Sequence, residues 1–234
     1  MKKPQLFLLH FAGGNCYSYQ FMTPLLKGFE VVALELPGRG KRMNEPLLKN
    51  FSLAGRDIFY QVRSRLTGAP FIIYGHSLGA YLALRVAGLL QNASKSPAYL
   101  IVSGNAGPGE HTDTADLHLL PQDEFLVEVK KLGGMPQEFL EHNDLLAFFE
   151  PVLRADFQLS GRHGLEDEPP VNIPLFAMMG SEEEKNDRLA NWGRFTTAAF
   201  NNAILEGNHF FIYKHPERIV NIINDCFTRV HVKP

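Results

Sequence analysis

The chain has 234 residues, which is enough for one substantial domain with a buried core. Hydrophobic residues make up 45% and charged residues 21%, and the formal net charge is −2, as in an ordinary soluble globular protein. This balance excludes a strong general attraction to nucleic acid or to an anionic membrane, and the largest basic cluster holds only Arg39, Lys41 and Arg42. No apolar stretch approaches the roughly 18 residues of a membrane span.

The two cysteines, Cys16 and Cys226, lie near opposite ends of the chain, and neither has a partner at the spacing of a metal site. Two thiols do not make a disulfide framework of the kind found in small secreted proteins. The apolar run at residues 6–11 is too short for the core of a signal peptide. We therefore expect a cytoplasmic protein without a metal or another cofactor.

Short apolar runs alternate with helical patterns along most of the chain. The runs are nearly continuous rather than alternating, which is typical of parallel strands covered on both faces. They predict strands at residues 6–9, 31–34, 71–74, 100–102 and 175–178. The helical patterns lie at residues 17–26, 52–66, 78–90, 186–200 and 216–230. This order predicts an α/β fold with a mainly parallel central sheet and helices on both faces.

One segment interrupts the alternation. Roughly 70 residues without a strand pattern separate the strand that ends near Ser103 from the one that begins near Ile173, and so long a connection is usually functional. Helical patterns occur within it at residues 122–132, 136–140 and 144–158. We expect a single domain over residues 1–234 with a helical lid inserted at about 113–165. The alternative is a decorating subdomain that only stabilises the fold.

A Gly-x-Ser-x-Gly motif at residues 75–79 lies between a predicted buried strand and a predicted helix. In this context the motif predicts a nucleophile elbow, a sharp turn that holds a serine clear of the strand end. The flanking glycines allow strand and helix to approach closely around the turn. Ser77 is therefore the expected nucleophile, and the backbone N–H of Leu78 is an expected donor to the substrate oxygen.

A serine nucleophile needs a general base, which in folds with this elbow follows the last strand. His209 follows a strand-like run at residues 203–205 and a glycine turn, so it is the expected base. His215 precedes Pro216 at a helix start, where a capping or surface role is more typical. His76 and His10 lie near the elbow and the first strand, and we expect both to pack or hydrogen-bond locally.

The acid of the expected triad should leave the end of the strand at 175–178 at once in order to reach the histidine. This favours Glu182 or Glu183 over Asp187, which lies a helical turn further on. Glu183 is the expected acid, with Asp187 and Glu182 as alternatives. Most of the carboxylates in this stretch are expected to be a solvated helix start. The second oxyanion donor should come from the loop at residues 10–15, with the N–H of Ala12 as the candidate.

The chain resembles the type II, or stand-alone, thioesterases of nonribosomal peptide and polyketide synthase systems. The resemblance extends over nearly the whole length, and its most discriminating elements are Gly-Gly-x-Pro at 133–136 and Leu-Arg-Ala-Asp at 153–156, which general esterases lack. Further similar segments are 9–14, 36–42, 75–80, 103–104, 120–121 and 208–211.

The resemblance implies an α/β-hydrolase fold and hydrolysis of acyl thioesters on the phosphopantetheine arm of an acyl- or peptidyl-carrier protein. It also implies an editing role that releases stalled or mis-primed acyl groups. The chain departs from the family in two places. The family commonly has an aspartate where this chain has its glutamate-rich run, and a basic residue is often seen where residues 105–108 have none.

Apolar residues at helical spacing in the expected lid are candidates for the acyl pocket, although such stripes are more often core. The substrate-binding candidates are Phe125, Phe148, Phe149 and Leu153. Weaker candidates for carrier docking are Arg39, Lys41 and Lys130, and we expect a monomer. The rival functions are a carboxylester hydrolase or lipase, and a non-catalytic binding protein of the same fold, which typically lacks the serine or the histidine.

Overall fold

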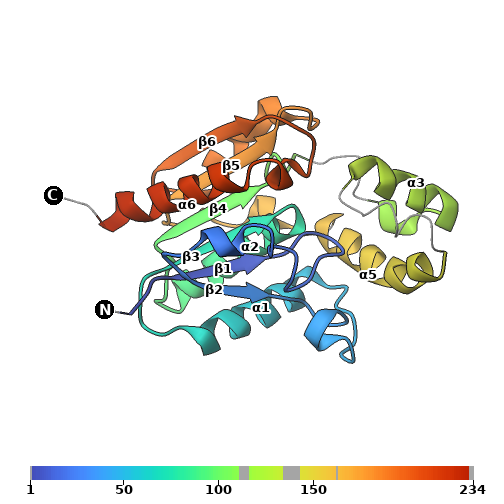
Figure 1. Ribbon diagram of the computed structural model, residues 1–234, viewed down its shortest axis with the longest axis horizontal. Helices are drawn as coiled ribbons and strands as arrows, with labels where there is room; N and C mark the ends of the chain where they lie inside the picture. Colours follow the sequence, from blue (N-terminus) through green and yellow to red (C-terminus); the bar gives the residue numbers. More distant parts are fainter. Residues whose placement is uncertain (1, 111–115, 134–142, 162, 232–234) are drawn as a thin grey trace.

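The computed structural model describes residues 2–110, 116–133, 143–161 and 163–231. Its central sheet has the strand order β2-β1-β3-β4-β5-β6, and every neighbouring pair is parallel (Figure 1). The strands are β1 (Gln5–Leu9), β2 (Glu30–Leu34), β3 (Phe71–His76), β4 (Tyr99–Ser103), β5 (Leu175–Gly180) and β6 (Phe200–Leu205). The expectation of a mainly parallel sheet is confirmed.

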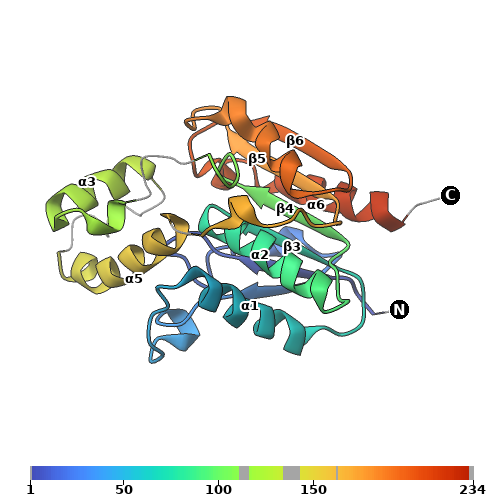
Figure 2. The same cartoon turned by 180° about the vertical axis from the view of Figure 1, so that it is seen from behind.

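Helices cover both faces of this sheet. Helices α1 (Phe51–Arg65) and α2 (Leu78–Asn92) lie on one face, and α6 (Pro216–His231) lies on the other (Figures 1 and 2). Alternate side chains of β1 serve the two layers, since Phe7 packs in the core beneath α1 and α2 while Leu8 packs in the core beneath α6. Burial on both faces explains why the strands are continuous apolar runs.

The predicted helix at residues 17–26 is wrong. The structure has turns there and a short 3-10 helix, Thr23–Leu25. Side chains at the start of this segment bond to nearby backbone groups instead, because the Tyr17 N–H donates to Asn15 Oδ1 at 2.8 Å and the Asn15 N–H donates to Ser18 Oγ at 2.9 Å. Such local bonds compete with helix formation.

The predicted helix at residues 186–200 is only partly right. A 3-10 helix covers Asn186–Phe195, and the extended residue Thr196 and a bend lead from it into β6. The N–H of Val171 donates to the carbonyl of Phe195 at 3.0 Å, and Val171 forms a parallel bridge with Thr196. This pairing draws the chain out of the helix at that point.

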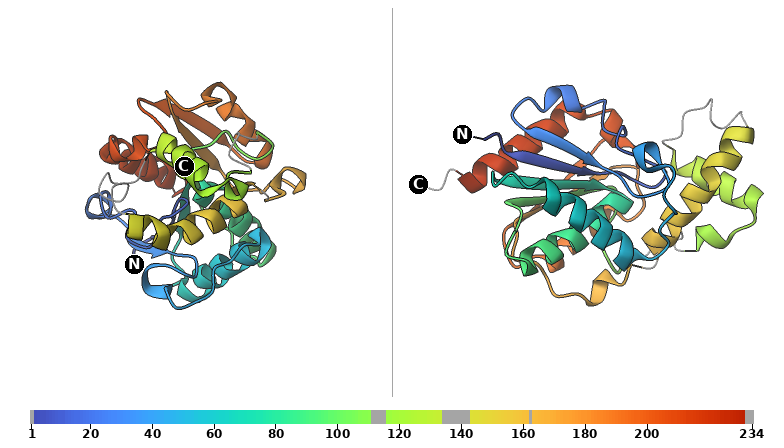
Figure 3. Two further views of the ribbon diagram at one scale, coloured as in Figure 1. Left: turned by 90° about the vertical axis from the view of Figure 1, so that its right-hand side faces the viewer. Right: turned by 90° about the horizontal axis from the view of Figure 1, so that it is seen from below.

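The segment between β4 and β5 forms a helical insertion, a term used here for the 3-10 helix Leu117–Leu119 together with α3 (Gln122–Leu132) and α5 (Asn143–Gly161). It stands beyond the carboxyl ends of the strands, away from both chain termini (Figures 1 and 3). It has its own small core, and the guanidinium of Arg154 on α5 donates to the carbonyls of His118 and Leu120, both at 2.9 Å. The helix expected at residues 136–140 lies outside the described residues.

Among the residues that the structure describes, no helix combines the length and the apolar character needed to cross a membrane.

Candidate active site

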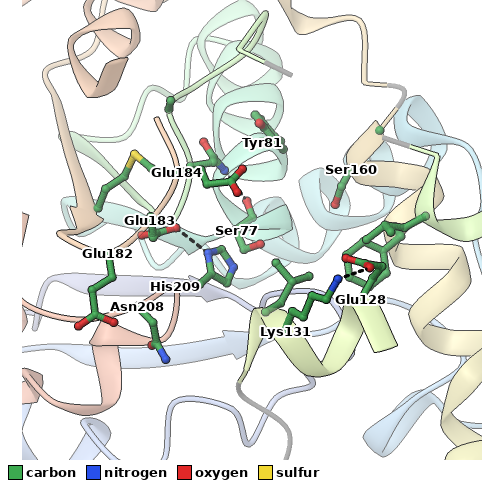
Figure 4. Close-up of a pocket in the computed structure, with 18 of the residues that line it drawn as sticks. Ser77, Tyr81, Glu128, Lys131, Ser160, Glu182, Glu183, Glu184, Asn208 and His209 are labelled. Carbon is green, nitrogen blue, oxygen red and sulfur yellow. Dashed lines mark hydrogen bonds and ion pairs between the residues drawn. The ribbon is translucent and has the colours of Figure 1, made fainter. Parts of the chain in front are cut away.

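A cavity of about 390 Å³ lies where the carboxyl ends of the strands meet the helical insertion (Figure 4). Segments that follow β3, β4, β5 and β6 form one side of it and bring together Ser77, Asn105, Glu183 and His209. The insertion contributes apolar side chains to the other side, namely Leu117, Leu132 and Phe157. Binding sites in parallel α/β sheets form at this edge.

Ser77 occupies a strained turn between β3 and α2. Its φ of 57° and ψ of −118° lie outside the backbone regions that residues other than glycine ordinarily adopt. A Cβ at Gly75 would lie 2.0 Å from the carbonyl oxygen of Gly79, and one at Gly79 would lie 2.2 Å from that of Leu9. The two glycines are therefore required for the turn, as the motif predicts, and the turn presents Ser77 at the cavity wall.

His209 and Glu183 form a hydrogen-bonded pair at this cavity. The Nδ1 of His209 donates to Glu183 Oε2 at 2.7 Å, and the other carboxylate oxygen accepts the N–H of Gly180 at 2.7 Å. The carboxylate side chain is only 7% exposed, so water competes little for it. With Nδ1 engaged, Nε2 is the remaining ring nitrogen, and Figure 4 shows the imidazole beside Ser77.

The structure separates Glu183 from the two alternative acids. The N–H of Glu182 donates to the carbonyl of Gly207, and its side chain is exposed at the cavity rim. Asp187 has a side chain that is 76% exposed, and its ion-pair contact is with Arg188. Of the three candidates, Glu183 is thus the carboxylate that the structure pairs with His209.

His76 lies fully buried beneath the pair. Its Nδ1 hydrogen-bonds to the hydroxyl of Ser103 at 2.9 Å, and the hydroxyl of Tyr74 bonds to the same oxygen. Its ring packs 4.9 Å from that of His209, centroid to centroid. Burial holds the pKa of His76 well below its usual value, so an uncharged ring packs against His209.

His10 and His215 bond to their surroundings away from the Glu183–His209 pair. The Leu36 N–H donates to Nε2 of His10, and Nδ1 of His10 donates to the Phe11 carbonyl. Burial, reinforced by the charge of Arg39, lowers the pKa of His10 to about 4. His215 donates to the carbonyl of Glu206 at 2.7 Å.

The loop at residues 10–15, termed the β1 loop, directly follows β1. Three of its amides are committed to other partners. Gly13 N–H donates to Asp156 Oδ2 at 2.8 Å, Gly14 N–H donates to the Phe11 carbonyl at 2.9 Å, and Asn15 N–H donates to Ser18 Oγ at 2.9 Å. Leu78 begins α2 directly after Ser77, at a helix N-terminus. The end of β1 packs closely against the elbow, because a Cβ at Gly79 would lie 2.2 Å from the carbonyl oxygen of Leu9.

The four substrate-binding candidates do not line the cavity. Phe125 and Leu153 belong to the buried core of the insertion, and the guanidinium of Arg154 lies 4.3 Å from the centre of the Phe125 ring. Phe148 is 56% exposed, and Phe149 packs against it at 5.4 Å between ring centroids. Helical spacing thus identified two core residues of the insertion, Phe125 and Leu153, rather than residues of the cavity wall.

The three carrier-docking candidates differ in their exposure to solvent. Arg39 is only 5% exposed and forms a buried, bidentate ion pair with Asp156, so it offers no docking surface. Lys41 and Lys130 are exposed. The expectation for Arg39 is wrong, because its guanidinium is buried against the carboxylate of Asp156 on α5.

Sequence reasoning missed several residues that line the cavity. Leu132, Phe157 and Lys131 belong to it, and Lys131 pairs with Glu128 at 2.6 Å. Leu132 and Phe157 directly adjoin the Gly-Gly-x-Pro and Leu-Arg-Ala-Asp elements, which was the signal available for them.

A parallel sheet, a strained serine after its third strand and a late histidine define the α/β-hydrolase class of serine hydrolases. The chain belongs to the thioesterase domain family, whose model matches residues 4–227. It is accordingly a serine hydrolase that acts on thioesters, as the sequence predicts.

Individual relatives match the chain over nearly its full length. The gramicidin S biosynthesis protein GrsT of Aneurinibacillus migulanus is 30% identical over 229 residues, which are 94% of this chain and 88% of that protein. The structure of ClbQ from the colibactin NRPS/PKS pathway superposes with a TM-score of 0.91 at 27% identity and covers 99% of both chains. The type II thioesterase BorB from the borrelidin biosynthetic cluster has a TM-score of 0.86 at 25% identity, over 96% of this chain and 93% of its own.

Proposed function

We propose that the protein hydrolyses acyl thioesters carried on the phosphopantetheine arm of carrier proteins, as an editing type II thioesterase of a nonribosomal peptide or polyketide system. The observation that carries the chemistry is the Glu183–His209 pair beside the strained Ser77, in a cavity walled by the helical insertion. The names of the relatives support the biosynthetic setting, since ClbQ is named for the colibactin NRPS/PKS pathway, GrsT for gramicidin S biosynthesis, and BorB as a type II thioesterase from the borrelidin biosynthetic cluster.

In the proposed mechanism Ser77 Oγ attacks the thioester carbonyl while Nε2 of His209 accepts its proton. Glu183 keeps the Nδ1–H tautomer of His209 and stabilises the imidazolium that forms. The carbonyl oxygen becomes an oxyanion held by the N–H groups of Ala12 and Leu78. The C–S bond then breaks, and His209 returns the proton to the departing thiolate.

The second half of the reaction hydrolyses the acyl-enzyme. Water takes the place of the thiol, His209 removes its proton, and the new tetrahedral intermediate collapses to release the carboxylic acid and Ser77. The same two N–H groups serve both intermediates, so one geometry supports both steps.

The helical insertion acts in this proposal as a lid over the acyl group, within a single domain that spans residues 1–234. Leu132 and Phe157 supply its apolar wall, and the pantetheine arm enters at the open side of the cavity. In this scheme the enzyme works as a cytoplasmic monomer.

The test is mass spectrometry of carrier proteins loaded with several acyl groups, after incubation with the wild-type enzyme or with Ser77→Ala. The wild-type enzyme should return the carriers to their free-thiol form, and Ser77→Ala should leave them loaded. If the carriers lose their acyl groups at equal rates with both proteins, Ser77 is not the nucleophile. A preference for free p-nitrophenyl esters over carrier-bound thioesters supports the rival carboxylester hydrolase instead.

A further inference from the structure

A buried ion pair joins the helical insertion to the segment between β2 and α1. Asp156 on α5 is fully buried, and both of its carboxylate oxygens contact Arg39, at 2.5 and 2.8 Å. Arg39 lies in the segment after β2. A buried bidentate pair is geometrically rigid, because either charge alone would be strongly unfavourable at that position.

The same carboxylate also holds the β1 loop. Asp156 Oδ2 accepts the N–H of Gly13 at 2.8 Å, so it serves the guanidinium and the loop amide together. Arg39 is directed toward the same loop through the carbonyl of Gly14, at 3.5 Å. The ion pair therefore connects three chain segments at one point.

A packing contact accompanies the hydrogen bond. Leu153 precedes Asp156 by one helical turn, so both side chains leave the same face of α5. Gly13 has a φ of 74°, and a Cβ there would lie 2.6 Å from Leu153 Cδ2. The insertion thus both bonds to the β1 loop and packs directly against it.

From these contacts we propose that Asp156 and Arg39 are positioning residues through which α5 sets the direction of the proposed oxyanion donor in the β1 loop, the N–H of Ala12. Ala12 is joined to Gly13 by one peptide bond, so fixing the Gly13 amide restricts the direction of the Ala12 N–H. The inference rests on the proposed role of Ala12. It explains why the insertion carries an aspartate at a position with no access to substrate.

The experiment compares two paired replacements, so that no buried charge is left alone. Arg39→Met with Asp156→Leu removes the charges and the acceptor of Gly13 N–H. Arg39→Met with Asp156→Asn removes the charges and keeps an amide oxygen for that N–H. Arg85→Met with Glu168→Leu, which removes an ion pair between α2 and the segment before β5, is the matched control.

The variants are assayed on a small acyl thioester such as an acyl N-acetylcysteamine, with a trifluoromethyl ketone as a probe of oxyanion binding. The variant with Arg39→Met and Asp156→Leu should have a kcat about 30-fold lower than wild type and a KM changed less than threefold. Its affinity for the trifluoromethyl ketone should fall by a similar factor. The Asp156→Asn pair should recover at least tenfold of the lost rate, and the Arg85 control should match the wild type. A folded Asp156→Leu pair with kcat and ketone affinity within threefold of wild type overturns the proposal.

Hydrogen exchange of the wild-type protein gives a second test that depends on no variant. If α5 holds the β1 loop, the Gly13 amide and the α5 amides around Asp156 should exchange through one shared opening, at rates within a few-fold of each other. Exchange of Gly13 more than tenfold faster than those amides overturns the coupling. Neither test uses a carrier protein, so an error in the carrier assignment leaves both outcomes readable.

Discussion

The carboxylate of Glu183 is held at both of its oxygens, one by Nδ1–H of His209 and the other by the N–H of Gly180, each at 2.7 Å. The N–H of Gly180 fixes which carboxylate oxygen faces His209. In a Glu183→Gln variant it therefore also fixes which group of the amide faces His209.

Glu183→Gln should lower kcat by about 10³-fold to 10⁴-fold with a small effect on KM. The carbonyl oxygen of the new amide will stay with the Gly180 N–H, so its NH₂ group will face His209 and stabilise the wrong tautomer. Steady-state kinetics on an acyl thioester measure the effect. Asp187→Asn is the matched control and should stay within about twofold of wild type; a comparable loss there would assign the acid to Asp187.

Gly79→Ala should destabilise the protein by about 3 kcal/mol and remove activity. The added Cβ would lie 2.2 Å from the carbonyl oxygen of Leu9, so the elbow and β1 must separate. Urea unfolding measures the loss. Gly28→Ala, where the new Cβ meets nothing within 4 Å, is the control and should be neutral; equal unfolding midpoints for the two variants contradict the close approach.

Folding stability should fall as the pH falls from 6.5 toward 4, partly because of His10. The pKa of His10 is about 4 in the folded protein, so in this window the unfolded chain binds a proton that the folded protein does not. Between pH 8 and pH 5 the titration of His10 should lower the free energy of unfolding by about 2 kcal/mol.

The buried His76, whose pKa is also lowered, adds to the same slope, so a variant is needed to isolate His10. His10→Gln keeps an acceptor for the Leu36 N–H but cannot titrate. Its stability, measured by urea unfolding at both pH values, should lose about 2 kcal/mol less than the wild type. An identical pH dependence in the two proteins refutes the assignment.

Leu132→Phe should narrow the range of acyl groups accepted, because Leu132 lies on the cavity wall. The value of kcat/KM for the longest acyl thioester tested should fall about tenfold relative to the shortest. A chain-length series measures the ratio. Phe148→Ala changes a side chain that is 56% exposed and should leave the ratio unchanged; a shift there would return Phe148 to the substrate pocket.

Much of the architecture could be predicted because the sheet is buried on both faces. Every continuous apolar run became a strand, and the position of each strand end placed Ser77, Glu183 and His209 at one edge. The order of elements and the elbow motif are local signals, so they are readable from the chain alone.

What failed depends on contacts that are distant in the sequence. The burial of Arg39 follows from Asp156 on α5, and no local pattern around Arg39 reveals that partner. The face of the insertion that meets the cavity depends on how α3 and α5 pack together, so periodicity identified Phe125 but not Leu132. The 3-10 segments similarly reflect side chain–backbone bonds and strand pairing that outweigh helical propensity.

The order of the strands along the chain determines at what stage of folding the protein can become active. Residues through β4 already contain the elbow and the β1 loop, whereas Glu183 and His209 follow β5 and β6, which form one edge of the sheet. A molecule that has not yet docked these last two strands holds a serine with no base. Recovery of thioester hydrolysis during refolding should therefore report completion of the sheet, and partly folded chains should be inactive toward thioesters.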